Sequence, residues 1–216
     1  RLTNYGYRSI FLTSPKGKLY LSIGPSPFIL DDEISSKITQ AVNNRKTEFT
    51  GFYYCKTENL IHYDVISPLI DQKNNVIASV VLRIAPEDFI FPLIQSWPTP
   101  SKTAETLIIR KEGNKILFLN ELRHKKNTAL KLEAELTSKD LPAARAIAGF
   151  TGIFYGKDYR NVDVISYLSP VPGTKWYMVS KIDSDEVLSE LKYRATAIAV
   201  FILVLIILTT ASLSWL

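Results

Sequence analysis

Apolar and polar residues alternate with a period of two over several short stretches in the first half of the chain. One longer stretch, which begins at Asp31, instead places Ile34, Ile38, Ala41 and Val42 on one face of a helix, with Asp31 as its N-cap. The pattern predicts five strands and one helix, at residues 7–13, 19–23, 31–44 (the helix), 49–56, 60–69 and 76–84.

The second half shows the same order of elements. A helix is expected at about 138–148, with Ser138 as its N-cap and Pro142 in its first turn, where a missing N–H costs nothing. The alternating stretches predict strands at residues 106–111, 115–119, 151–157, 162–169 and 175–182.

An internal repeat supports this division into halves. The segment FTGFYYCK at 49–56 matches FTGIFYGK at 150–157, and DVIS at 64–67 recurs at 163–166. The two matches keep their order along the chain, as duplicated structural units do. Two strands, a helix and three antiparallel strands form a PAS-like order. We therefore expect an α+β fold with two tandem PAS-like lobes, each a five-stranded antiparallel sheet with flanking helices.

The lobes are followed by an uncharged, apolar segment. Residues 195–216 contain no charged side chain, and about 20 such residues cross a bilayer as a helix. Neither Gly nor Pro occurs from Ser184 onward, so one continuous helix is predicted, with Ser184 as its N-cap. The expected organisation is a membrane-distal lobe at 1–90, a Pro-rich connector at 91–103, a membrane-proximal lobe at 104–183, a juxtamembrane helix at 184–194 and a transmembrane helix at 195–216.

The composition and the motifs of the sequence argue against several functional classes. The net charge of +5 is scattered, and a basic face with interleaved aromatic side chains, as nucleic-acid binding requires, is not visible. One cysteine and two histidines form no metal-ligand or catalytic spacing, and no phosphate-binding or nucleophile motif is present. The sequence thus predicts no enzymatic activity, no catalytic residue, no metal site, no cofactor and no nucleic-acid partner.

Specific segments resemble the double Cache family of extracytoplasmic sensors. They are DVISPLIDQKNNVIASVVLRIAPEDF in the first lobe, YRNVDVISYLSPVPGTKWYMVSKID in the second, and the stretch that begins FPLIQSWPTPSKTAETLIIRK between them. This last stretch looks like the middle of sensor regions attached to histidine kinases and diguanylate cyclases.

The resemblance implies a receptor. It implies a small-molecule ligand in the distal lobe, a homodimer, an inner-membrane location with residues 1–194 extracytoplasmic, and an output domain beyond Leu216 that carries any kinase or cyclase activity. The alternative is a dimerisation or protein-docking module with no small-molecule ligand of its own. A small ligand requires a cavity, whereas a protein ligand favours an exposed apolar patch.

Two features depart from the family pattern. Members begin with a transmembrane helix and a stalk helix, and this sequence opens at Arg1 with neither, so we expect a fragment. The amino-acid-binding members carry a Tyr…Arg-x-Trp-Tyr…Asp pattern in the distal lobe, which residues 1–90 lack. Arg83 lies about where the final Asp of that pattern is expected.

Alternation within strands selects the candidate ligand site. Gly51 and Cys55, like Gly152 and Gly156, share one strand face, where small side chains would let a stalk helix approach. Tyr54 would then face the ligand pocket together with Phe52.

The predicted ligand-binding residues are Tyr54, His62 in the next strand and Arg83 in the last. A buried guanidinium needs an anionic partner, so the expected ligand is a carboxylate or another small anion. Asp64 is assigned an architectural role because Asp163 repeats it.

Overall fold

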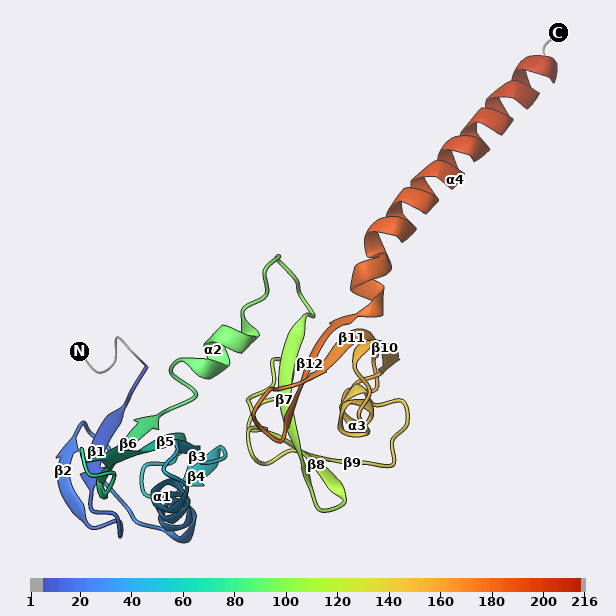
Figure 1. The fold of residues 1–216 in the computed structure, drawn as a ribbon. Coiled ribbons are helices and arrows are strands. Elements are labelled where there is room, and N and C mark those ends of the chain that lie inside the picture. The colour runs from blue at the N-terminus through green and yellow to red at the C-terminus, as the bar shows by residue number, and fades with distance from the viewer. Residues whose placement is uncertain (1–5, 215–216) are drawn as a thin grey trace. The chain divides into compact units, whose positions relative to one another are not determined.

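The computed structural model describes residues 6–214, and the chain divides into two compact units (Figure 1). The first unit runs to Ser96 and includes the short stretches 119–121 and 125–131; the second contains the rest, including the long C-terminal helix. Each unit is built on a six-stranded antiparallel sheet. The predicted α+β class is confirmed.

In the first unit the strand order across the sheet is β2-β1-β6-β5-β3, and β4 also pairs with β5. A helix, α1, packs on one face of this sheet, and a short helix, α2, follows the last strand. The bounds are β1 Ser9–Thr13, β2 Leu19–Ile23, α1 Asp32–Asn44, β3 Glu48–Phe49, β4 Tyr53–Cys55, β5 Leu60–Ile70, β6 Val76–Ile84 and α2 Ile90–Gln95.

Helix α1 forms where its sequence signals place it. The Asp31 carboxylate accepts a hydrogen bond of 2.8 Å from the Ile34 N–H, and the helix ends at Arg45 in a left-handed conformation. Its apolar stripe of Ile34, Ile38 and Ala41 is buried against the sheet. The predicted cap and the predicted buried face are therefore both confirmed.

The second unit has the strand order β10-β11-β12-β7-β8-β9, with helix α3 packed on one face (Figure 1). Its core combines apolar side chains of β7, β8, β11 and β12 with three alanines of α3. The bounds are β7 Glu105–Glu112, β8 Lys115–Phe118, β9 Glu133–Glu135, α3 Pro142–Ile147, β10 Gly152–Lys157, β11 Asp163–Pro170, β12 Trp176–Asp183 and α4 Ser184–Ser214.

The structure corrects several predicted elements. Each sheet has six strands rather than five, because the stretch 49–56 divides into β3 and β4 and because β9 adds an edge strand in the second unit. The predicted connector at 91–103 contains all of α2 except its first residue. Helix α3 begins at Pro142, as its ring favours, and its N-cap is Leu141 rather than Ser138.

The DVIS repeat occupies corresponding strands but opposite faces. Asp64 and Ile66 of β5 are fully buried on the side of α1, whereas Asp163 of β11 is exposed and its neighbour Val164 is buried. Side chains alternate across a strand, so a shift of one residue exchanges the two faces. Asp64 and Asp163 therefore have no common architectural role, contrary to the prediction.

Helix α4 follows β12 without a break, as predicted, and begins at Ser184 itself (Figure 1). Its apolar window is long enough to cross a membrane, and none of that window is buried in the protein. Of the predicted transmembrane segment, residues 215 and 216 lie outside the described residues.

Candidate functional site

A buried ion pair lies at the centre of the first unit. Arg83 of β6 and Asp64 of β5 are 1% and 0% exposed, and they are cross-strand partners. The guanidinium donates from Nε to Asp64 Oδ1 and from Nη2 to Asp64 Oδ2, both at 3.0 Å, the two-point geometry that arginine forms with carboxylates. The anionic partner predicted for Arg83 is thus supplied by the chain itself.

Tyr53 completes this network. Its hydroxyl donates to Asp64 Oδ2 at 2.7 Å and accepts from Arg83 Nη2 at 3.0 Å. Burial, and then the charge of Asp64, raise the pKa of Tyr53, so the phenol keeps its proton and remains a donor. Arg83 Nη1 also donates to the Pro27 carbonyl at 2.9 Å. A guanidinium has five N–H donors, and these contacts use four of them.

A cavity of about 220 Å³ opens beside this network. Aromatic, cationic and carboxylate side chains all border it. The lining residues are Ile29, Asp31, Ile34, Tyr53, Tyr54, Cys55, Lys56, Thr57 and Arg83. Concave sites with a few polar groups on an apolar lining are the usual form of small-molecule sites.

The structure brings together two of the three predicted site residues. Arg83 and Tyr54 both line the cavity, with Tyr54 at 41% exposure and hydrogen-bonded to Asn59. His62 is fully buried and lies outside the lining, in an edge-to-face contact with Tyr53 at 5.8 Å. Burial, and then the charge of Arg83, lower the pKa of His62, so its imidazole is neutral at neutral pH.

Apart from Tyr54, which does line the cavity, the predicted strand faces are reversed. Tyr53 pairs with His62, so Tyr53 and Cys55 share the face that carries the ion pair, whereas Phe52 packs against Tyr63 and Phe91. In the second unit, a side chain at Gly156 would collide with the Asp140 carbonyl. In the second unit, the face assigned to a stalk helix is therefore occupied at Gly156 by residues of the same unit, whereas nothing lies within 4 Å of a side chain added at Gly152.

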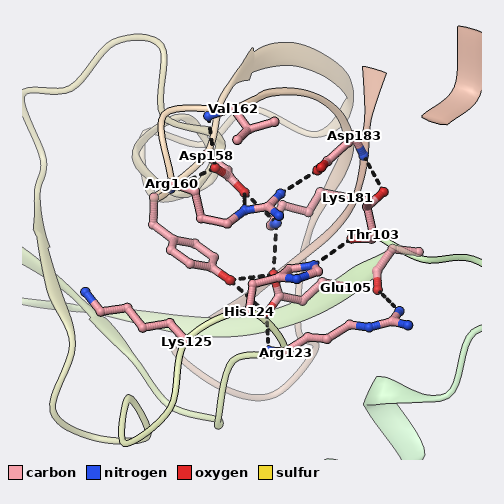
Figure 2. A network of polar contacts seen from close by, with 12 residues as sticks. Thr103, Glu105, Arg123, His124, Lys125, Asp158, Arg160, Val162, Lys181 and Asp183 are labelled. Atoms are coloured by element: carbon pink, nitrogen blue, oxygen red, sulfur yellow. Dashed lines mark hydrogen bonds and ion pairs between the residues drawn. The ribbon is translucent and has the colours of Figure 1, made fainter. Parts of the chain in front are cut away.

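The second unit has a buried cation of its own, Lys181 of β12. Its ammonium lies 2.7 Å from Asp158 Oδ2 and 2.9 Å from Glu105 Oε2. Figure 2 shows how Arg160 extends this cluster from Asp158 to Asp183. Tyr159 donates to Glu105 at 3.0 Å, as Tyr53 does to Asp64. The cluster satisfies its own charges.

The space beside Lys181 measures only about 10 Å³, which is the volume that one water molecule needs. Burial raises the pKa of Asp158, but hydrogen bonds and ion pairs with Lys181 and Arg160 outweigh that effect and hold the pKa below its ordinary value. The two units thus share a buried cation in the last strand, and of these two cations Arg83 adjoins the larger space.

Sequence reasoning missed Tyr53, Asp31 and Asp64 at this site. The alternation of buried positions in β5 contained a usable signal, since Asp64 falls in phase with Ile66, a core residue. A carboxylate at a core position of a strand requires a buried cation as its partner. Arg83 likewise falls on a buried position of the alternation in β6.

The sequence matches no protein-family profile, and no curated protein is significantly similar to it. Solved structures share its fold. The ligand-binding domain of the Pseudomonas aeruginosa amino-acid chemoreceptor PctB, in complex with L-Gln, is 16% identical, with a TM-score of 0.57 over 91% of this chain and 78% of that one.

Two further sensor domains are similar. The periplasmic sensory domain of the Campylobacter jejuni chemoreceptor Tlp1 is 15% identical, with a TM-score of 0.56 over 84% and 74% of the two chains. The extracellular domain of a protein described as a histidine kinase is 17% identical, with a TM-score of 0.58 over 86% and 78%. The tandem-lobe fold expected from the resemblance is confirmed, and these similar structures are ligand-binding or sensory domains of receptors.

Proposed function

We propose that this chain is the extracytoplasmic ligand-sensing region of a membrane receptor, and that its ligand is a small carboxylate bound in the cavity beside Arg83. The observation that carries the proposal is the contrast between the two units. The cavity of the first measures about 220 Å³, whereas the space beside Lys181 in the second is about 10 Å³. A ligand of a few heavy atoms fits the former, which is smaller than typical drug sites.

Hydrogen-bond donors at the cavity favour an anionic group. Arg83 and Lys56 both line it; Asp64 neutralises the charge of Arg83, but its contacts with the described residues leave one N–H donor of the guanidinium unused. The Asp31 carboxylate, which also lines it, is engaged in capping α1. The similar chemoreceptor structures hold GABA, L-isoleucine, L-Gln or L-serine, each of which carries a carboxylate.

A thermal-shift screen of the full chain in detergent tests the ligand. Small carboxylates are compared with their neutral amides, and a true ligand at one hundred times its dissociation constant raises the stability by about 2.7 kcal/mol. We expect one carboxylate to raise the melting temperature and its amide to have no effect. If no carboxylate does so, the ligand class is wrong; if no small molecule of any class does so, the docking-module alternative gains support.

A variant pair tests the location. Lys56→Gln should weaken carboxylate binding, because it removes a cation from the cavity edge. Lys73→Gln, in the exposed turn between β5 and β6, is the matched control and should bind normally. Arg83→Ala is a poor test because it would leave Asp64 buried without a partner. Equal affinity in the two lysine variants would move the site elsewhere.

The receptor role also requires a membrane anchor and an orientation. Helix α4 supplies an uncharged stretch from Ala195 onward, which supports a membrane span. The similar periplasmic and extracellular sensor domains support a location of the two units outside the cytoplasm. Protease added to sealed vesicles of known orientation should reach both units from the extracytoplasmic side. Protection from that side would invert the proposed orientation.

The proposal includes a homodimer, which the resemblance to double Cache sensors implies. Light scattering of the detergent-solubilised chain measures its mass directly. A dimer mass is expected, and a monomer mass at all concentrations would remove this part of the proposal.

A further inference from the structure

The hairpin formed by β4 and β5 brings together three side chains, of which only Cys55 also lines the ligand cavity. Tyr53 pairs with His62 and Cys55 with Leu60, so Cys55 and His62 lie on the same face of the hairpin. Glu58 lies in the turn between the two strands. One ligand atom from each of Cys55, Glu58 and His62 lies within 4.8 Å of the others.

His62 is buried without satisfying its polar atoms. It is 0% exposed, and neither ring nitrogen forms a hydrogen bond with the described residues. Its Nε2 lies 3.1 Å from Glu58 Oε2, but that oxygen also forms no hydrogen bond within the described part of the chain. Two buried polar groups that face each other in this way carry a free-energy cost that a shared cation would remove.

Glu58 is oriented for such a role by its second oxygen. Its Oε1 accepts hydrogen bonds from Ser26 Oγ at 3.0 Å and from Arg8 Nε at 3.4 Å. These contacts fix the carboxylate so that Oε2 faces His62. Metal ligands are characteristically held by a second layer of hydrogen bonds of this kind.

We propose that Cys55, Glu58 and His62 bind a Zn²⁺ ion in the first unit. Thiolate sulfur, imidazole nitrogen and carboxylate oxygen are the three ligand types that zinc takes in proteins. A tetrahedral zinc site separates its ligand atoms by roughly 3.3–3.8 Å, so small side-chain movements bring the three within range. Three protein ligands leave a fourth position for water or another small molecule.

The charges and the access route suit this ion. The Glu58 carboxylate and a Cys55 thiolate together balance the two positive charges of zinc. Of the two nearby arginines, Arg83 is neutralised by Asp64, and Arg8, which contacts Glu58, also lies 3.8 Å from Asp88. Cys55 lines the open cavity, which gives the ion a path to the buried His62.

The first experiment uses the wild-type chain. Cys55 is the only cysteine, so alkylation by a thiol reagent reports on this position alone. Only the free thiolate reacts, and saturating Zn²⁺ should therefore slow the reaction by roughly tenfold or more, while Mg²⁺ should not. An unchanged rate with Zn²⁺ would overturn the proposal without any mutation.

The second experiment measures Zn²⁺ affinity of the full chain in detergent by calorimetry. Cys55→Ala, Glu58→Gln and His62→Gln should each lower the affinity by about 10-fold to 100-fold or more. His124→Gln and Glu135→Gln replace an exposed histidine and an exposed glutamate of the second unit and should leave it unchanged.

Cobalt(II) provides a third readout. Bound to wild type it should give the visible absorption of a tetrahedral thiolate complex, and that absorption should disappear in Cys55→Ala. If Zn²⁺ binds equally well to folded Cys55→Ala, or if cobalt shows no thiolate absorption, the assignment is wrong. These measurements use the metal alone, so their outcome is separate from that of the carboxylate screen.

Discussion

Asp64 and Arg83 face each other across β5 and β6, and two hydrogen bonds of 3.0 Å join the carboxylate to the guanidinium. Both side chains are buried, so neither charge is solvated by water. Each therefore depends on the other, and the cavity that Arg83 borders is built around a charge already neutralised by the protein.

Asp64→Asn should destabilise the chain by about 3–5 kcal/mol, because it leaves the Arg83 guanidinium buried without a counter-charge. Asp163→Asn is the matched control, since it changes the same residue of the repeated DVIS segment at an exposed position. We expect an effect within about 0.5 kcal/mol there. Urea unfolding of both variants measures the difference. Similar losses of stability in the two variants would mean that Asp64 and Asp163 occupy equivalent positions after all.

Asp158→Asn should lower the free energy of unfolding at neutral pH, and its difference from wild type should shrink in acid. The folded-state pKa of Asp158 lies below its ordinary value of 3.8, so its ion pairs stabilise the protein above that pH. As the pH falls from 3.8 through the folded-state pKa, wild type loses this contribution and the variant does not. The gap in unfolding free energy between the two proteins should therefore shrink below about pH 4. A gap that is constant with pH would contradict this assignment.

Glu186→Gln should loosen the attachment of α4 to the segment before β7. The Glu186 carboxylate accepts hydrogen bonds from the backbone N–H groups of Lys102 and Thr103, at 2.9 and 2.8 Å, and from the Ser101 hydroxyl at 2.8 Å. Amide hydrogen exchange at 102–103 should accelerate on the order of tenfold in the variant.

Asp185→Asn is the control for this change, because Asp185 pairs with Lys192 at the surface. Exchange at 102–103 should be unchanged in that variant. Equal protection in the two variants would show that the carboxylate does not hold the segment.

Ile202→Arg should impair membrane insertion. Ile202 lies within the uncharged part of α4, where an arginine near the bilayer centre costs about 2.5–3.5 kcal/mol. Ser189→Arg adds the same charge before the apolar stretch and should be tolerated. Alkaline extraction of membranes separates inserted from released chains, and normal retention of Ile202→Arg would argue against a span at this position.

The local elements were largely determined by the sequence. Asp31 and the spacing of Ile34, Ile38 and Ala41 define α1, and the absence of Gly and Pro from Ser184 onward defines α4, because capping and helical periodicity act within a few residues. The tandem-lobe fold also follows from the order of strands and helices.

Tertiary structure alone decided which faces of the strands meet. The register between β4 and β5 places Tyr53 rather than Tyr54 opposite His62, and the register between β5 and β6 places Asp64 opposite Arg83. A shift of one residue moves every side chain of a strand to the other face, and the repeat conceals such a shift. The sequence supplied Cys55, Glu58, His62 and Arg83, but the registers of β4, β5 and β6 determined which of their side chains became neighbours.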